Sequence, residues 1–186
     1  NEIYAAFSDY TAQFQPEDTV KLRLYRDENL SLAALYSLQK WEKEALSKHV
    51  WLKSGASLII EPTETLTVID VNTGKAINGK KAGDETFYRI NEEAARESMR
   101  QLRLRNLSGM ILIDFINMED ATYNEKLMQL LKELAAKDRI PVNVVDMTGL
   151  RLVELTRKKV KKPLHEMITS ERDSCAFCTK MNLKAN

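Results

Sequence analysis

The sequence has only two cysteines, no long apolar segment and almost no net charge in 186 residues. Two cysteines cannot build the disulfide framework that stabilises small secreted domains. No apolar run approaches the roughly 20 residues that a membrane-spanning helix needs, and the first residues lack the basic and then apolar pattern of a signal peptide. These absences lead us to expect a protein of the cytoplasm without a membrane span.

The charge balance excludes a protein whose entire surface attracts nucleic acid, because 28 basic and 27 acidic residues leave a formal net charge of +1. The basic residues are unevenly distributed, however. Residues 151–162 contain six basic residues and a single acidic one. A polyanion partner would meet the chain here, and Arg157, Lys158 and Lys159 are our candidates for contacts with its phosphates. The alternative, which the pattern leaves open, is a basic segment that is only solvated.

The content of 44% hydrophobic and 30% charged residues is that of a globular chain. The sequence has no internal repeat or low-complexity stretch, so we divide it by changes in hydrophobic period. Residues 1–54 show helical spacing up to Phe14, strand-like alternation at residues 20–25 and a second helix that begins near Asn29. Residues 163–186 form a tail with too few apolar residues for a core of its own.

The remaining region, residues 55–162, alternates between strands and helices and forms the body of the chain. Short apolar or alternating segments predict strands at residues 57–61, 64–72, 110–113, 142–145 and 152–155. Longer segments with helical spacing predict helices at residues 84–106 and 123–134. This order is typical of an α/β fold, in which helices pack on a sheet that is at least partly parallel.

Two aspartates are expected at the ends of neighbouring strands. Asp70 shares one face of its strand with Asn72, because side chains two residues apart point the same way. Asp114 ends an apolar run typical of a central strand, and open α/β folds bind ligands at the carboxyl edge of such strands. Oxygen ligands of this kind suit Mg²⁺, which can activate water and stabilise charge on a phosphate. The same spacing also allows both aspartates to cap helices or accept backbone hydrogen bonds in loops.

Five segments resemble successive motifs of the ribonuclease E/G family, in the order and with the spacing of that family. The resemblance extends from about Tyr36 to Cys178. The segments are Thr63–Gly74, Asn91–Ala95, Arg100–Asn106, Ile113–Met118 and Leu152–Lys158. Five ordered motifs are a more specific signal than any one of them, and the chain is identified by them as a member of this family.

The resemblance implies an endoribonuclease that cuts single-stranded RNA by hydrolysis that depends on Mg²⁺ or Mn²⁺ and leaves a 5′-phosphate on the downstream product. The two metal-binding aspartates of the family correspond to Asp70 and Asp114, and the supporting asparagine corresponds to Asn72. The resemblance also implies a DNase I-like catalytic subdomain at residues 55–162, preceded in residues 1–54 by the end of an RNase H-like subdomain.

The family's OB-type RNA-binding domain and 5′-end sensor have no counterpart in residues 1–35. We therefore expect the chain to be a fragment of a family member. Because the domains that hold the RNA are absent from it, we expect weak RNA binding and little cleavage by the isolated chain.

Cys175 and Cys178 are separated by two residues, as in half of a metal site. In the family, a cysteine pair from each of two protomers completes one zinc site, and four thiolates suit tetrahedral Zn²⁺. The resemblance therefore implies a homodimer that shares a structural Zn²⁺. Ala176 stands where the family carries proline, which keeps a pair of free thiols as the alternative.

Two further positions depart from the family pattern. Asn117 replaces an aspartate close to the expected metal site, and Gly149 replaces an arginine that contacts the 5′ end of RNA. Arg151 lies on the same side as Gly149 if this segment is extended. These departures favour a second hypothesis, a catalytically silent RNA-binding or assembly module of the same fold, whereas the intact aspartate pair favours the enzyme.

Overall fold

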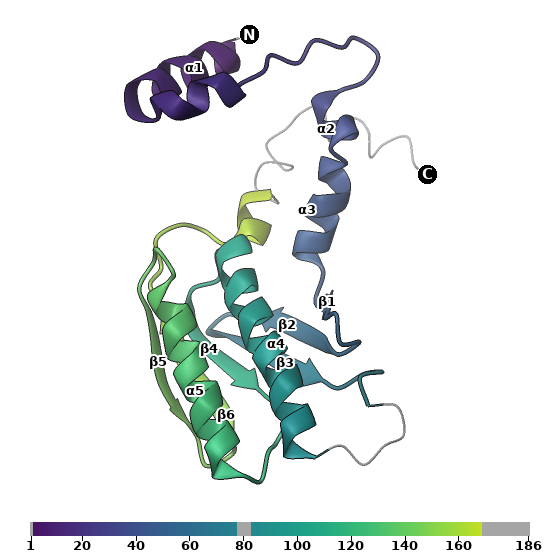
Figure 1. Ribbon diagram of the computed structural model, residues 1–186, viewed down its shortest axis with the longest axis vertical. Helices are drawn as coiled ribbons and strands as arrows, with labels where there is room; N and C mark the ends of the chain where they lie inside the picture. The colour runs from purple at the N-terminus through teal and green to yellow at the C-terminus, as the bar shows by residue number, and fades with distance from the viewer. Residues whose placement is uncertain (1, 78–82, 169–186) are drawn as a thin grey trace. The chain divides into compact units, whose positions relative to one another are not determined.

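The computed structural model describes residues 2–77 and 83–168, and the chain forms two compact units, Asn1–Glu44 and Ala45–Asn186. The elements of the first unit, in chain order, are α1 (Glu2–Phe14), the 3-10 helix η1 (Pro16–Lys21), α2 (Leu32–Leu35) and α3 (Leu38–Leu46), which runs across the boundary (Figure 1). The helix expected up to Phe14 is confirmed.

The prediction of a strand at residues 20–25 is wrong, because η1 includes residues 20 and 21 and residues 22–25 are irregular. A strand needs a neighbour for its backbone hydrogen bonds, and residues 2–44 contain no other strand. Val20 accordingly remains 84% exposed. The helix expected from Asn29 begins later, after Ser31, whose hydroxyl accepts a hydrogen bond from the backbone N–H of Ala34 at 3.1 Å.

The second unit is a six-stranded sheet with two long helices. Its elements are β1 (His49–Trp51), β2 (Ser57–Pro62), β3 (Leu66–Asn72), α4 (Asp84–Leu104), β4 (Gly109–Asp114), α5 (Ala121–Ala136), β5 (Val142–Met147) and β6 (Leu152–Arg157). The strand order is β1-β2-β3-β4-β6-β5, with β3 and β4 parallel and every other pair antiparallel. This confirms the predicted mixed sheet with packed helices.

The division between the two compact units falls between Glu44 and Ala45. The reason is β1, a three-residue edge strand that pairs with β2 and therefore belongs to the sheet. A strand of three residues is too short to show a two-residue period, so the sequence pattern does not reveal it.

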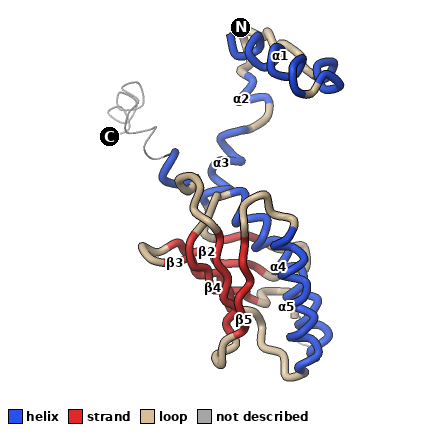
Figure 2. The backbone as a smooth tube through the Cα atoms, turned by 90° about the vertical axis from the view of Figure 1, so that its left-hand side faces the viewer, coloured by secondary structure: helices blue, strands red, loops and turns tan. Residues whose placement is uncertain are grey.

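Both long helices lie on the same face of the sheet, as Figures 1 and 2 show. In β3 the side chains of Thr67, Ile69 and Val71 are buried beneath this layer, and the alternate side chains are half-buried or exposed. A fully buried aliphatic side chain contributes about 1.5–3 kcal/mol. The largest fully buried side chains include Ile69, Ile111, Ile113, Val153 and Leu155 of the sheet, Met99 and Leu102 of α4, and Leu127 and Leu131 of α5.

The other face of the sheet carries no helix of the second unit within the residues that the structure describes (Figure 2). Half-buried or exposed side chains of the strands, Asp70 among them, point to this side. The sheet therefore presents one open face on which polar residues can act. Of the described helices, none combines the length and the apolar character that crossing a membrane requires.

Candidate functional site

The site is built at the ends of the two parallel strands. Asp70 of β3 and Asp114 of β4 are register partners in the parallel pairing. Neighbouring strands lie about 4.8 Å apart, and register partners in a parallel pair point to the same side of the sheet. Both aspartates therefore lie next to each other on the open face, where Asp70 is half-buried and Asp114 is exposed. The juxtaposition expected from the sequence is confirmed.

Asn72 joins this pair from the end of β3. Its side-chain Nδ2 donates a hydrogen bond to Oδ2 of Asp70 at 2.6 Å. Since the two residues are separated by one position in a strand, they share a face. The carboxamide therefore restrains the orientation of the Asp70 carboxylate.

The two carboxylates influence each other electrostatically. Loss of hydration raises the pKa of the Asp114 carboxyl, and the negative charge of Asp70 raises it further. Both effects mean that holding two negative charges side by side at this edge is unfavourable. A cation bound between the carboxylates would relieve this repulsion.

The donor set fits Mg²⁺ better than a metal that needs a complete protein cage. Within the described ranges, no group of three or more histidine, cysteine, aspartate or glutamate side chains is placed to hold a metal. Mg²⁺ is commonly held by one or two carboxylates and completes its shell with water and substrate phosphates. Asp70 and Asp114 would be its protein ligands, with Asn72 supporting Asp70.

Helix α4 holds the loops around the site through two side chains that sequence reasoning did not identify. Asn91 is completely buried and forms two hydrogen bonds with the backbone of Ile116, to its carbonyl oxygen at 2.7 Å and from its N–H at 3.0 Å. Ile116 lies two residues beyond Asp114. The sequence contained a signal for the role of Asn91, because this residue lies on the buried face of its helix and a buried amide requires hydrogen-bond partners.

Glu93 holds a second loop. Its carboxylate accepts hydrogen bonds from the backbone N–H groups of Lys53 at 2.7 Å and Ser54 at 3.2 Å. This turn continues into Gly55, whose carbonyl accepts a hydrogen bond from Lys75 in the loop that follows Asn72. Glu93 therefore supports the segment at the end of β3.

Arg151 does not lie in an extended segment, so the condition for placing it on the same side as Gly149 is not met. It has a positive φ of 65° in a turn before β6, and its backbone N–H donates to the carbonyl of Thr148 at 2.8 Å. Its guanidinium donates a hydrogen bond to the carbonyl oxygen of Met118. Arg151 thus ties the turn next to Gly149 to the loop that follows Asp114.

Arg157 is buried, and this does not support the expectation that it contacts RNA. Its side chain is 3% exposed and pairs with Asp138, which is 2% exposed, at 3.0 Å. It also donates hydrogen bonds to Asn106 and to the carbonyl of Leu107. The physical reason is the two-residue period of β6, which places Arg157 on the same covered face as Leu155.

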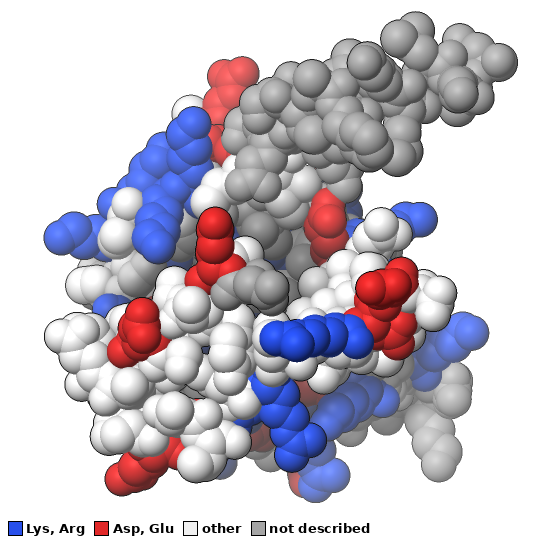
Figure 3. Space-filling view, turned by 90° about the horizontal axis from the view of Figure 1, so that it is seen from above, with Lys and Arg blue, Asp and Glu red and all other residues white. Residues whose placement is uncertain are grey.

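Lys158 and Lys159 are exposed and remain candidates for phosphate contacts. Basic and acidic side chains both occur across the face seen in Figure 3, in keeping with the balanced charge. Cys175 and Cys178, the expected half of a zinc site, lie outside the described residues.

Known proteins resemble this chain over most of its length. The sequence profile of the ribonuclease E/G family matches residues 1–160. Over 172 residues, 92% of this chain, the sequence is 37% identical to ribonuclease G of Escherichia coli (strain K12) and covers 35% of that protein. It is 39% identical over 148 residues, 80% of this chain, to ribonuclease E of Synechocystis sp., of which it covers 22%.

A third relative is the chloroplastic ribonuclease E/G-like protein of Arabidopsis thaliana, which is 34% identical over 177 residues. The match includes 95% of this chain and 18% of that protein. The chain thus spans about a third or less of the length of these relatives. With a family profile that matches most of its length and several relatives above 30% identity, the chain belongs to the ribonuclease E/G family.

Proposed function

We propose that this chain forms the catalytic part of an endoribonuclease that cuts single-stranded RNA by Mg²⁺-dependent hydrolysis and leaves a 5′-phosphate on the downstream product. The observation that carries this proposal is the pairing of Asp70 with Asp114 at adjacent strand ends in a member of the ribonuclease E/G family. The chain's relatives include ribonucleases G and E, which supports the same reaction class.

The residues of the site have separate roles in this proposal. Asp70 and Asp114 hold the cation, and Asn72 fixes the orientation of the Asp70 carboxylate. When bound there, a divalent cation lowers the pKa of water and offsets the negative charge of the phosphodiester. Asn91 and Glu93 keep the surrounding loops in place, so the carboxylates need little reorganisation when RNA binds.

The subdomain assignment is part of the same proposal. We assign residues 55–162 to a DNase I-like catalytic subdomain and residues 1–54 to the end of an RNase H-like subdomain. The motifs of the sequence support this assignment. A homodimer that shares Zn²⁺ through Cys175 and Cys178, and a location in the cytoplasm, stay predictions.

Activity is proposed for the whole protein, since the chain spans about a third of the length of ribonuclease G. In the whole protein, we expect Asp70→Asn or Asp114→Asn to abolish RNA cleavage while the fold is retained. Retained Mg²⁺-dependent cleavage by either variant would overturn the proposal.

The 186-residue chain itself allows a direct test of the cation site. We expect titration with Mn²⁺, followed by paramagnetic broadening of NMR signals, to show one site near residues 70–72 and 114. Asp114→Asn should abolish it. Asp146→Asn is the matched control, because Asp146 is an exposed carboxylate on β5, an edge strand of the same sheet. No Mn²⁺ site in the unmodified chain would favour the catalytically silent module instead.

A further inference from the structure

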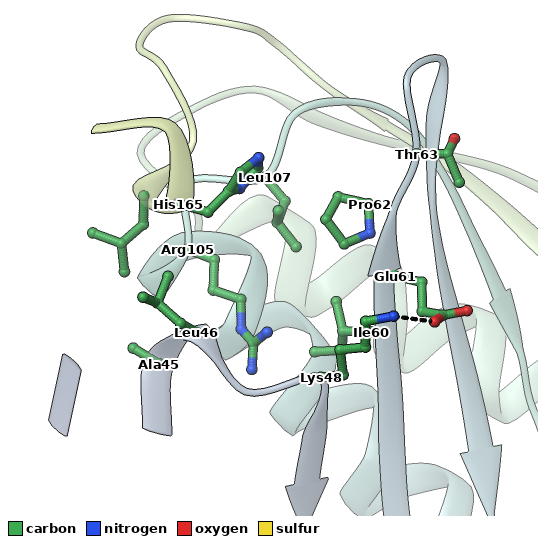
Figure 4. A pocket seen from close by; sticks show the side chains of 11 residues that line it. Ala45, Leu46, Lys48, Ile60, Glu61, Pro62, Thr63, Arg105, Leu107 and His165 are labelled. Carbon is green, nitrogen blue, oxygen red and sulfur yellow. Dashed lines mark hydrogen bonds and ion pairs between the residues drawn. The ribbon is translucent and has the colours of Figure 1, made fainter. Parts of the chain in front are cut away.

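A cavity of about 370 Å³ lies in the second unit, at the opposite end of the β2–β3 hairpin from the aspartate pair. Its apolar wall consists of Leu46, Ile60, Pro62, Leu107 and Leu164, and its polar groups include Arg105, Lys48 and Glu61 (Figure 4). Pro62 pairs with Thr67 at the start of β3, whereas Asp70 lies toward the end of that strand. Ligands at the two places would therefore not compete for the same residues.

Arg105 is held in the cavity by a series of side chains along α4. The Nε of Arg105 donates to the carboxamide oxygen of Gln101 at 2.7 Å, and the carboxamide nitrogen of Gln101 donates to Glu97 at 2.7 Å. The three residues are spaced four apart and lie on one side of the helix. Gln101 accepts from Nε, so this series of hydrogen bonds does not use the two terminal nitrogens of the guanidinium.

One of these terminal nitrogens has no partner. Arg105 as a residue is only 7% exposed, and among the described residues its buried Nη2 forms no hydrogen bond. Burial lowers the pKa of the Arg105 guanidinium, but an arginine in a protein remains charged. A buried cation with an unsatisfied donor is unfavourable unless an acceptor reaches it.

The charges around the cavity favour an anion as that acceptor. Lys48 is exposed at the rim, where its Nζ pairs with Glu61 at 2.9 Å. Lys48 and Glu61 compensate each other at the rim. Glu97, whose charge acts on Arg105, is itself paired with Arg100, so the open position for an acceptor is at Nη2 of Arg105. In the view of Figure 4 the guanidinium lies between the side chains of Leu46 and Ile60, two of the apolar residues that line the cavity.

We propose that this cavity binds a small amphiphilic anion, with an oxyanion head on Arg105 and an apolar body against the aliphatic wall. The planar guanidinium can donate two parallel hydrogen bonds to the two oxygens of a carboxylate or a phosphate. A cavity of this size, mostly apolar with a few fixed polar groups, has the character of a small-molecule site. The head group can be a carboxylate or a phosphate monoester, and the experiment distinguishes them.

The probes are hexanoate, hexyl phosphate and hexan-1-ol, which share one apolar body and differ in the head group. Each is titrated into the 186-residue chain, and the side-chain Nε–Hε signal of Arg105 is followed by ¹H–¹⁵N NMR. We expect at least one anion to shift this signal saturably and to bind at least tenfold more tightly than the alcohol. The anion with the higher affinity identifies the head group.

Two variants test the assignment to Arg105. Arg105→Met should lower anion affinity at least tenfold and raise the melting temperature, because it removes a buried unsatisfied donor while keeping much of the side-chain volume. Lys48→Gln, at an exposed position that leaves folding intact, should weaken binding severalfold, because the negative charge of Glu61 at the rim is then uncompensated and repels the anion. Lys132→Gln, an exposed control on α5, should change nothing.

Three results would overturn the proposal: no shift with either anion, equal affinity for hexan-1-ol, or full anion binding by Arg105→Met. If Arg105→Met does not fold, unchanged binding by Lys48→Gln overturns it in the same way. The site is independent of the proposed nuclease reaction, since Asp114→Asn should leave anion binding unchanged.

Discussion

The side-chain amide of Asn91 forms hydrogen bonds through both its oxygen and its nitrogen with the backbone of Ile116, which lies two residues beyond Asp114. Helix α4 and the loop after β4 are thereby joined at the candidate cation site. Asn91→Ala removes both hydrogen bonds and leaves the N–H and carbonyl of Ile116 unsatisfied. We expect a loss of about 2–3 kcal/mol in the free energy of unfolding and a weaker Mn²⁺ affinity.

Urea unfolding and Mn²⁺ titration of the same variant measure the two effects. Asn143→Ala is the control, because Asn143 is an exposed asparagine on β5. The role given to Asn91 would be disproved by an Asn91→Ala protein that unfolds and binds Mn²⁺ like the control.

The position of the aspartate pair could be predicted because it depends only on strand period and strand order. The alternation in β3 places Thr67, Ile69 and Val71 on the covered face and leaves Asp70 and Asn72 on the open face. The apolar run before Asp114 likewise marks a central strand. These patterns are local, and the two-residue period of a strand converts them directly into a face of the sheet.

The supporting contacts could not be predicted, because their partners are distant in sequence. Asn91 and Ile116 are joined across two elements, and the partner of Arg157 is Asp138, in the connection between α5 and β5. The burial of Arg157 itself was indicated by its place two residues after Leu155. We nevertheless grouped Arg157 with the basic residues Lys158 and Lys159 that follow it, rather than with the buried positions of the strand.

Gly74 is a position where only glycine fits. It has a positive φ of 51°, and a Cβ built there would lie 2.6 Å from the carbonyl oxygen of Gly55. Gly74→Ala therefore combines an unfavourable dihedral with a backbone clash, and we expect a loss of at least about 1 kcal/mol in unfolding free energy. Thermal unfolding of Gly74→Ala and Gly149→Ala compares this position with one that has open space around it. Equal stability of the two variants would contradict the expected clash.

The buried pair of Asp138 and Arg157 predicts a loss of stability in acid. Burial by itself would raise the pKa of Asp138, but hydrogen bonds from Arg157 and from the N–H of Ile140, with the charge of Arg157, outweigh it and lower the pKa. The pair therefore stabilises the fold fully above the unfolded-state pKa of about 3.9. This stabilisation is lost as the pH falls below that value and through the lowered pKa of the folded state.

Removal of one partner tests the same pair at neutral pH. Arg157→Leu leaves the carboxylate of Asp138 buried without its cation, and we expect it to cost about 3–5 kcal/mol. Urea unfolding between pH 2.5 and 7 should show a smaller acid-dependent loss in Arg157→Leu than in the unmodified chain. Equal pH dependence in both proteins would show that the pair does not determine acid stability.

Lys158 and Lys159 are the exposed basic residues next to the buried Arg157, and they allow RNA contact to be separated from folding. Each phosphate neutralised on a single strand contributes about 0.7 to the slope of log affinity against log salt concentration. We expect Lys158→Gln with Lys159→Gln to weaken binding of a single-stranded RNA oligonucleotide and to reduce this slope by about 1.4 if each lysine contacts one phosphate. Fluorescence anisotropy at several salt concentrations measures both quantities.

The matched control is the double variant Lys132→Gln with Lys137→Gln, which removes two exposed lysines, one in α5 and one in the residue that follows it. Equal slopes for the two double variants would mean that residues 158 and 159 form only a solvated segment.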